Sequence, residues 1–190
     1  MANEARKLVS PEEYLELERA AETRHEYIDG EIVAMAGAGL NHNLIVSSLI
    51  GNLYNLLKGK NCNIFPSDMR LHIPVNGLYT YPDVMVACGQ REFTDEKKDT
   101  LTSPSLIVEV LSPSTEDYDR GGKFMRYRNI ASLQEYLLID STGILAEKFA
   151  RDENGTWFLN EYRDHNAIIN LKSLNVEISL AEIYARTEEP

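Results

Sequence analysis

The sequence has little cysteine, a single tryptophan and no long apolar run among its 190 residues. No apolar stretch reaches the roughly 18 residues that a transmembrane helix needs, so no membrane partner is expected. Residues 1–7 are polar and charged, which argues against a secretory signal and predicts a cytoplasmic protein. Cys62 and Cys88 lack C-x-x-C spacing, and we therefore expect two reduced, partly buried thiols.

Positive charge is also scarce. Lysine and arginine number 19 against 30 aspartates and glutamates, which gives a net charge of −11. Proteins that bind nucleic acids usually present basic surfaces, because much of their affinity comes from neutralising phosphates. Net charge governs solubility and long-range steering, however, and does not describe one groove. A run without acidic residues predicts a local basic face made of Arg120, Lys123, Arg126 and Arg128.

What remains is the composition of an ordinary globular protein, and the length suits one domain over residues 1–190. Capping signals and helical spacing predict helices near residues 10–21, 41–57, 112–129 and 180–185. Apolar runs predict strands at 62–73, 81–87, 106–111 and 135–140, with further strands to about 163. Asp29-Gly30 and Asn154-Gly155 are typical hairpin turns. This order predicts an α/β fold with a mixed sheet flanked by helices.

Two carboxylates interrupt the apolar strands. Asp83 lies near the start of one strand and Glu109 lies within another. A buried carboxylate is unfavourable unless it is paired or bound to a metal. If the two strands are neighbours, the side chains converge at one end of the sheet, where Mg²⁺ would offset their repulsion. The alternative is that each carboxylate meets a lysine or arginine, or faces solvent at a strand end.

Lys123 lies where a helix can return it to these carboxylates. It follows Glu109 by the end of a strand, a Ser-Pro turn and two helical turns. Its ammonium is a compact charge that suits contact with a phosphate or orientation of a water. Arg126 and Tyr127, at positions i+3 and i+4, are expected on the same helix face. Glu26 and His42 are further candidates for the site, with a structural or capping role equally open.

Taken in order, these segments resemble the Uma family of putative restriction endonucleases, which belongs to the PD-(D/E)XK nuclease superfamily. The segments that carry the resemblance are Tyr81-Pro82-Asp83, residues 107–115 (IVEVLSPST), Lys123 with Tyr127, and residues 135–140 (EYLLID). It extends to residues 25–31 (HEYIDGE), to His42 and to residues 180–184 (LAEIY), and so covers nearly the whole chain. The ordered set is specific, whereas a Pro-Asp dipeptide alone is not.

The resemblance implies a restriction-endonuclease-like αβββαβ core, here with an N-terminal helix and hairpin and extra C-terminal strands. It implies that Asp83, Glu109 and the main-chain carbonyl of Val110 bind Mg²⁺ or Mn²⁺, and that Lys123 is the catalytic lysine beside the catalytic Asp83 and Glu109. The chain departs from the superfamily pattern at Leu111, since the usual lysine stands two residues after the glutamate. Lys123 must therefore reach the same point from the following helix.

Three functions are compatible with these residues. The first is a Mg²⁺-dependent endonuclease that hydrolyses phosphodiester bonds, with DNA as the partner by resemblance alone. The second is a catalytically inactive binding protein on a nuclease fold, which Leu111 and the acidic charge favour. The third is a metal-free glycosidase, which lacks support because Trp157 is the one tryptophan available as a sugar platform. The sequence leaves the oligomeric state open, a homodimer included.

Overall fold

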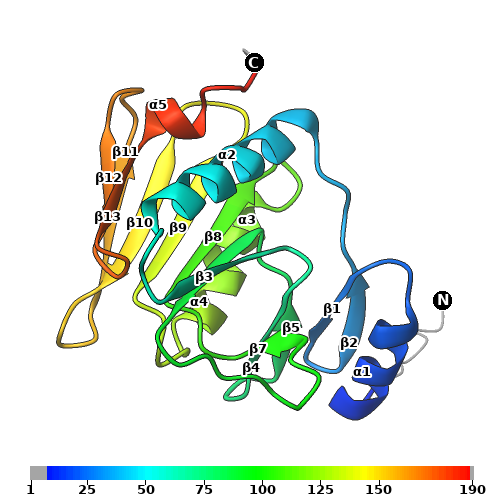
Figure 1. The fold of residues 1–190 in the computed structure, drawn as a ribbon. Coiled ribbons are helices and arrows are strands. Elements are labelled where there is room, and N and C mark those ends of the chain that lie inside the picture. Colours follow the sequence, from blue (N-terminus) through cyan, green and yellow to red (C-terminus); the bar gives the residue numbers. More distant parts are fainter. Residues whose placement is uncertain (1–7, 189–190) are drawn as a thin grey trace.

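The computed structural model describes residues 8–188, so residues 1–7, on which the expectation of no secretory signal rests, lie outside the described residues. Its strands form two main sheets and a separate hairpin, with helices packed against them (Figure 1). The predicted α/β architecture of mixed sheets flanked by helices is confirmed. Within residues 8–188, no helix is both long enough and apolar enough to cross a membrane.

The central sheet has six strands in the order β11-β10-β9-β8-β6-β3. Their bounds are β3 (Cys62–Pro66), β6 (Val84–Cys88), β8 (Leu106–Leu111), β9 (Glu135–Asp140), β10 (Ala146–Arg151) and β11 (Trp157–Tyr162). Strands β8 and β9 are parallel, and the other neighbours are antiparallel. Every residue of β8 is buried, as its continuous apolar pattern predicts.

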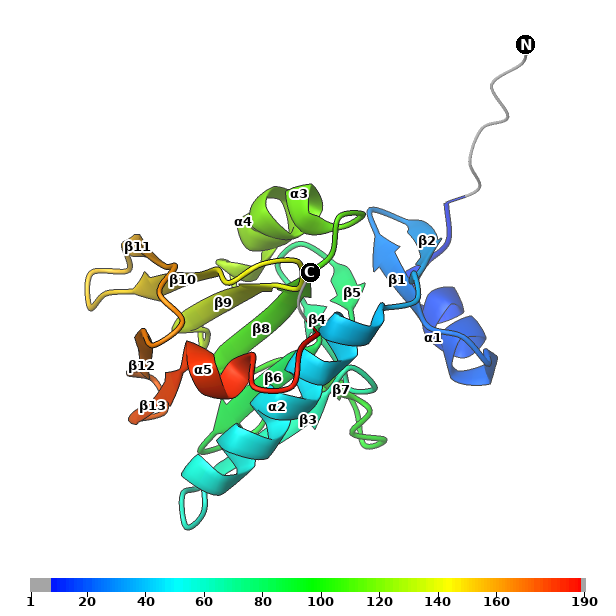
Figure 2. The same ribbon diagram turned by 90° about the horizontal axis from the view of Figure 1, so that it is seen from above.

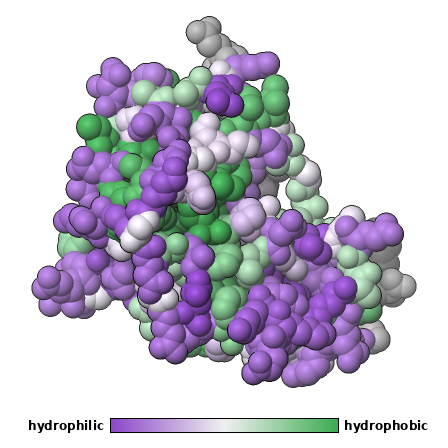
Figure 3. All heavy atoms as spheres, in the orientation of Figure 1, coloured by the Kyte–Doolittle hydropathy of each residue, from purple (hydrophilic) through white to green (hydrophobic). Residues whose placement is uncertain are grey.

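Helices cover both faces of this sheet, as Figure 2 shows. Helix α2 (Leu40–Leu56) buries Ile45, Leu49 and Leu53 against one face, at the spacing of a single helix stripe. The other face is covered by three successive segments, namely α3 (Glu116–Tyr118), the π-helical turn η1 (Asp119–Lys123) and α4 (Phe124–Tyr127). Together with β3, β6, β8 and β9 these helices form the expected αβββαβ core. On the face drawn in Figure 3, apolar residues gather over α2 and the strands beside it.

The second sheet is built around the N-terminal hairpin and has the order β2-β1-β5-β4-β7. Its strands are β1 (His25–Ile28), β2 (Glu31–Ala34), β4 (Arg70–Ile73), β5 (Leu78–Thr80) and β7 (Thr100–Leu101), and α1 (Pro11–Ala20) packs beside them. Asp29 and Gly30 have φ angles of 52° and 90°, which confirms the predicted hairpin turn. The segment 62–73 divides between the two sheets, because a turn at residues 67–69 separates β3 from β4.

The C-terminal part adds a hairpin and a short helix to the face that α2 covers. The hairpin is β12 (Ile168–Leu171) with β13 (Val176–Ser179), and α5 (Leu180–Ile183) follows directly. Ser179 and Glu182 form a capping box at the start of α5. Gly155, with a φ angle of 82°, lies in the predicted turn between β10 and β11. The expected additional C-terminal strands are confirmed, although the β12–β13 hairpin itself was not predicted.

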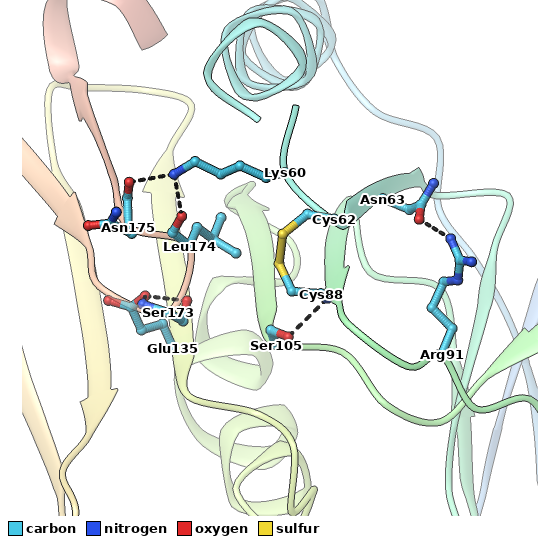
Figure 4. The surroundings of a disulfide bond; sticks show 10 residues. All are labelled: Lys60, Cys62, Asn63, Cys88, Arg91, Ser105, Glu135, Ser173, Leu174 and Asn175. Carbon is cyan, nitrogen blue, oxygen red and sulfur yellow. Dashed lines mark hydrogen bonds between the residues drawn. A yellow bond between two sulfur atoms is a disulfide. The ribbon is translucent and has the colours of Figure 1, made fainter. Parts of the chain in front are cut away.

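The two cysteines are joined by a disulfide, so the expectation of two reduced thiols is wrong. Cys62 and Cys88 lie directly opposite each other in the register of β3 and β6, with Cα atoms 4.0 Å apart. Their separation of 26 residues hides this pairing in the sequence. Figure 4 shows the bond next to Ser105, whose Oγ accepts a hydrogen bond from the Cys88 N–H at 3.2 Å. The disulfide fastens the edge strand β3 to β6, the strand that begins just after Asp83.

Candidate functional site

Asp83 and Glu109 meet at the point where β6 and β8 diverge. The register of these antiparallel strands pairs Val84 with Val108, so Asp83 and Glu109 occupy the next position beyond the last pair. The main-chain N–H of Asp83 donates to Oε2 of Glu109 at 3.3 Å. The predicted convergence of the two carboxylates at one end of the sheet is therefore confirmed, and its cause is strand register.

Val110 brings its main chain to the same place. Its N–H donates to Oδ2 of Asp83 at 2.8 Å. The N–H and C=O of one strand residue point to the same side of the strand, so the carbonyl of Val110 also lies on the side of Asp83. This carbonyl is beyond the last β6–β8 pair, and Val110 lines the adjoining cavity. The three predicted metal donors, from Asp83, Glu109 and Val110, are thus gathered in one place.

Lys123 reaches Glu109 from the helical segment, as predicted. Its Nζ lies 3.1 Å from Oε1 of Glu109 and 3.0 Å from Oδ1 of Asp119, the latter as an ion pair without hydrogen-bond geometry. The hydroxyl of Tyr127 donates to the same Oε1 at 2.7 Å. Two donors therefore hold Oε1 of Glu109, while Oε2 receives only the long bond from Asp83. Oε2 is the less engaged oxygen.

The π-helical turn η1 produces this placement. The sequence predicted one continuous helix over residues 112–129, whereas the chain forms α3, η1 and α4 in succession. Within η1, a Cβ on Gly122 would lie 2.5 Å from the ring of Tyr118, so glycine is required for the ring to pack there. Such turns occur frequently at functional sites. Here the turn buries both Asp119 and Lys123 beside the sheet.

Glu26 and His42, whose roles were open, both lie in the site. Oε1 of Glu26 accepts a hydrogen bond from the Thr80 hydroxyl and lies 3.7 Å from Nζ of Lys123. His42, in the first turn of α2, places Nε2 3.2 Å from Oδ2 of Asp83. Its Nδ1 is buried and has no hydrogen-bond partner among residues 8–188. Side chains from both sheets and both helical layers therefore converge here.

Negative charge exceeds positive charge at this point. Carboxylate oxygens of Glu26, Glu109 and Asp119 all lie close to the ammonium of Lys123. Asp83 adjoins Glu109 and adds a fourth carboxylate. Burial raises the pKa of Glu109 to about 8, with Lys123 opposing the rise and Asp83 and Asp119 adding to it. Burial also acts to lower the pKa of Lys123, but the carboxylates outweigh it and the net shift is upward. The lysine is thus held as a cation.

The donor set suits a divalent ion that keeps an open coordination sphere. Among residues 8–188, no group of three or more His, Cys, Asp or Glu side chains is placed to hold a metal ion, so any ion here would have fewer side-chain ligands. Mg²⁺ is usually held by one or two carboxylates and retains several waters, so two carboxylates and a carbonyl match its needs. Because Oε2 of Glu109 carries only a 3.3 Å hydrogen bond, it is available as a ligand. The residues present fit Mg²⁺ or Mn²⁺.

The carboxylates border a cavity of about 410 Å³. Its apolar wall comes from the hairpin and the segment that follows it, with Ile28, Val33, Ala34, Met35, Ala36 and Ala38. Its hydroxyl wall comes from the loop after β8, with Ser112, Ser114 and Thr115. Tyr118 and Lys123 also line the cavity. The site is therefore a bounded pocket rather than a flat surface.

The predicted basic face does not form around this pocket. Two arginines of the basic run are paired with carboxylates: Arg120 with Glu116 one turn away and with Glu147, and Arg126 with Asp29. Neither Arg126 nor Arg128 lines the cavity. Tyr127 shares the face of Lys123 as expected, whereas Arg126 turns to the hairpin. Asp29 lies 97 residues from Arg126 in the chain, so the sequence does not reveal this neutralisation.

Two features of the site were not recognised in the sequence. Asp119 is one, although its i, i+4 spacing from Lys123 is a signal that favours an ion pair on a helix. The apolar wall at residues 33–38 is the other, because the sequence predicts only a glycine-containing loop there. Its proximity to Asp83 depends on how the hairpin packs, which no local pattern reports.

Comparison with known proteins identifies a family and several relatives for this chain. The family model for Uma2, described as "Putative restriction endonuclease", matches residues 11–182. An uncharacterized protein of Synechocystis sp. (strain ATCC 27184 / PCC 6803 / Kazusa) is 41% identical over 178 residues, covering 93% of this chain and 91% of the relative. A second uncharacterized protein of that organism is 40% identical over 170 residues, covering 90% and 96%.

The fold also matches a solved structure. A crystal structure from Anabaena variabilis ATCC 29413, described as a putative nuclease belonging to DUF820, superposes with a TM-score of 0.77. The two chains are 19% identical, and the match covers 93% of this chain and 98% of the other. At this identity the likeness shows the fold alone.

Proposed function

Because this chain belongs to the Uma2 family of putative restriction endonucleases and has a nuclease-like fold, we propose that it is a metal-dependent endonuclease. The observation that carries the proposal is the excess of buried negative charge where β6 and β8 diverge. Asp83 and Glu109 lie side by side there, and within residues 8–188 Lys123 is the one ammonium paired with Glu109. Neighbouring buried carboxylates repel each other and lose hydration, so a bound cation would stabilise them.

In this proposal Asp83, Glu109 and the main-chain carbonyl of Val110 hold Mg²⁺ or Mn²⁺. The bound ion would lower the pKa of a water and screen the charge that develops on the phosphate. Lys123 supplies a fixed positive charge beside Glu109, which favours negative charge on the phosphate oxygens during hydrolysis. The Tyr127 hydroxyl, 2.7 Å from Glu109, orients that carboxylate.

The departure at Leu111 is compatible with this arrangement. Leu111 is 2% exposed and packs in the core between the sheet and α4, so a lysine there would place its charge among apolar side chains. Lys123 provides an ammonium at Glu109 from η1 instead. The helical segment thus supplies the lysine that strand β8 lacks.

DNA is the proposed substrate because the family description names restriction endonucleases. We propose a cytoplasmic location for the protein, where a DNA substrate would be available. Cytosolic thiols are usually kept reduced, so the Cys62–Cys88 disulfide makes this placement testable. Mass spectrometry of fractionated cells alkylated at lysis should find the bonded protein in the cytosolic fraction, and its absence from that fraction would contradict the placement.

A second candidate, the inactive binding protein, is favoured by one contact. Lys123 neutralises Glu109 directly at 3.1 Å, and Val110 satisfies one oxygen of Asp83 at 2.8 Å. These contacts also exist without a metal. Turnover therefore separates the two candidates.

The deciding experiment is plasmid nicking with Mg²⁺ or Mn²⁺ and with EDTA. We expect nicking with the metals only, and a loss of at least about a hundredfold in Asp83→Asn, the scale of removing one electrostatic catalytic group. Asp117→Asn is the matched control, because Asp117 is exposed on α3 and does not line the cavity. Full activity in Asp83→Asn would overturn the site, and an inactive parent with either metal would favour the binding protein.

A further inference from the structure

We propose that the cavity beside Asp83 and Glu109 accepts one unpaired nucleotide, so that the substrate is single-stranded nucleic acid rather than a duplex. This inference rests on the proposed nuclease function and names the substrate class for the same site. It depends on the walls and size of the cavity, on the pairing of nearby arginines and on two adjoining cavities.

The apolar wall offers a surface for a nucleobase. Val33 and Met35 are 41% and 37% exposed although both line the cavity. Val33 pairs with Glu26 in the hairpin register, so the wall stands directly beside the charged group. Apolar area exposed to water is unfavourable, and a ligand that covers it gains free energy. Every nucleobase has an apolar π-face that suits such a wall, whatever the sequence.

The opposite wall offers hydroxyl groups. Oγ of Ser112 lies 3.0 Å from Oγ of Ser114 and 3.1 Å from Oγ1 of Thr115. Serine and threonine hydroxyls commonly donate hydrogen bonds to phosphate and sugar oxygens. The cavity therefore combines an apolar wall for a base, hydroxyls for the sugar-phosphate and carboxylates for the ion. A nucleotide has the complementary parts.

The size of the cavity excludes a duplex. Its 410 Å³ lies within the range of roughly 300–1,000 Å³ that holds a small ligand. A paired base can enter such a pocket only by leaving its stack, at a cost of a few kcal/mol. An unpaired base enters without that cost, so the pocket selects for single strands.

Two arginines near the cavity are not free to neutralise the phosphates on which duplex affinity depends. Arg126 lies 2.6 Å from Asp29, and Arg120 lies 2.7 Å from Glu147. Both guanidinium groups are therefore already neutralised by protein carboxylates. Binding should rest on the ion, the hydroxyls and the apolar wall, and should depend only weakly on salt.

Two further cavities continue from the first along the ends of β8 and β9. One of about 330 Å³ shares His42 and Ser112 with the first cavity. The next, of about 530 Å³, shares Asn41, Ser141 and Glu188 with the second. Apart from the exposed Glu188, these shared residues carry neutral hydrogen-bonding groups or histidine. A continuous track of this kind suits an extended strand and distinguishes it from a free mononucleotide.

The test is binding of a fluorescent phosphorothioate strand of about 12 nucleotides, alone and annealed to its complement, in Mn²⁺. The phosphorothioate linkage resists hydrolysis, so affinity is read without turnover. We expect the single strand to bind at least about tenfold tighter than the duplex, with a salt slope of magnitude below about 2. Equal or tighter binding of the duplex would overturn the inference.

Val33→Asn tests the wall against the matched Val75→Asn. Val75 is 79% exposed on the turn between β4 and β5 and does not line the cavity. Val33→Asn should weaken single-strand binding about five- to tenfold, the effect of uncovering one valine side chain, while Val75→Asn should leave it unchanged. Met35→Asn, which lies outside the hairpin strands, provides a second variant if Val33→Asn unfolds. If both wall variants bind like Val75→Asn, the wall does not contact a base and the inference fails.

Plasmid nicking measured in parallel separates this inference from the proposed function. If nicking depends on Asp83 but the duplex binds better, the substrate class is wrong and the nuclease function stands. If the parent neither nicks nor binds either oligonucleotide in Mn²⁺, both proposals fall. If the single strand binds more tightly and nicking depends on Asp83, both are supported, because a supercoiled plasmid can be nicked where its strands are transiently unpaired.

Discussion

Two buried glutamate–lysine pairs lie on neighbouring strands of the central sheet, and their surroundings differ. Glu109 on β8 lies 3.1 Å from Lys123, and Glu135 on β9 lies 3.3 Å from Lys148. The four side chains are at most 11% exposed. Burial and ion-pair distance therefore do not distinguish the two pairs. The difference between them lies in the other residues that surround each pair.

Glu135 is saturated with hydrogen-bond donors. It accepts from the N–H of Lys172 at 3.2 Å. It also accepts from the N–H and hydroxyl of Ser173 at 3.0 and 2.5 Å, and Figure 4 shows these two residues side by side. Lys148 in turn donates to the carbonyl of Asn170 at 2.5 Å. This pair lines none of the three cavities described above. The pair fastens the β12–β13 hairpin to the central sheet, and both of its charged groups have partners within the protein.

Glu109 has the opposite surroundings. Asp83 is beside it, Asp119 and Glu26 share its lysine, and the group borders a cavity. A buried charge whose partners are all supplied by the protein stabilises the fold. A buried charge with an excess of its own sign is stabilised by something that binds. We therefore expect variants of the Glu109–Lys123 pair to change metal-dependent activity, and variants of the Glu135–Lys148 pair to change mainly the stability of the fold.

The largest expected difference is in catalysis. Glu109→Gln should reduce metal-dependent nicking at least about a hundredfold, because it removes a proposed ligand and part of the site's charge. Glu135→Gln, the same substitution on the next strand, should retain nicking per folded molecule. The measurement is initial rates in Mn²⁺ at a temperature where circular dichroism shows both variants folded. Comparable loss in both would mean that the two pairs have the same role.

The lysines should differ in how a metal changes stability. Lys148→Ala leaves Glu135 buried without its cation, which should lower the free energy of unfolding by about 3–5 kcal/mol, with or without metal. Lys123→Ala should also be less stable in EDTA, but Mn²⁺ should restore part of that loss by replacing the missing charge.

Urea denaturation with and without Mn²⁺ measures both effects, and calorimetry adds metal affinity. Lys123→Ala should lose turnover and bind the metal at least as tightly as the parent, because Lys123 is not a proposed ligand and its positive charge opposes a cation. If its metal affinity collapsed, Lys123 would be supporting the shape of the site rather than the chemistry.

Metal should stabilise the parent protein through the Glu109 site alone. An ion at about a hundred times its Kd stabilises the folded state by about 2.7 kcal/mol. At roughly 2–4 °C per kcal/mol for this size, Mn²⁺ should raise the Tm by about 5–11 °C. Asp83→Asn should be more stable than the parent in EDTA and lose most of this response. Identical melting of the parent in EDTA and in saturating Mn²⁺ would show that no ion binds.

The most gradual expected effect is the pH dependence of the metal-free protein. Burial raises the pKa of Glu109 from its ordinary 4.5 to about 8, so the folded state holds that proton more tightly than the unfolded state. The corresponding stability is fully present below pH 4.5 and is lost as the pH rises through about 8. The free energy of unfolding in EDTA should therefore fall between about pH 5 and 8, by at most about 1.4 kcal/mol per unit.

Glu109→Gln cannot titrate and should flatten this slope, whereas Glu135→Gln should leave it in place. Urea denaturation at several pH values is the measurement. A slope that survives in Glu109→Gln would assign the proton to another group.

Local features of the fold could be predicted because their causes are local. The Ser10 cap is confirmed by its hydrogen bond from the Glu13 N–H, and the Asp29-Gly30 turn by its positive φ angles. The apolar run of β8 is buried on both faces, as expected. Each signal lies within a few residues, where backbone geometry and side-chain period determine the outcome.

The candidate site could be predicted from the sequence only in part. Asp83, Glu109 and Lys123 were named from their positions in strands and helix and from the family resemblance, and the structure brings them together. Their catalytic and metal-binding roles stay predictions. Asp119 was missed although its i, i+4 spacing from Lys123 favours an ion pair, because its burial in η1 depends on packing. The basic face does not form around the cavity because Arg120 and Arg126 pair with carboxylates, among them Glu147 and Asp29 from other segments.

The sequence by itself determined the local elements, the apolar core strands and the set of residues able to carry out the chemistry. Tertiary structure decided which charges were compensated. Cys62 meets Cys88 through strand register, and Arg126 meets Asp29 across 97 residues. The physical reason is that side-chain period and capping act over one or two turns, whereas charge and disulfide pairing depend on distances that only packing brings about. The sequence therefore indicates which charged residues can form the site, and the fold determines whether their charges are balanced within the protein.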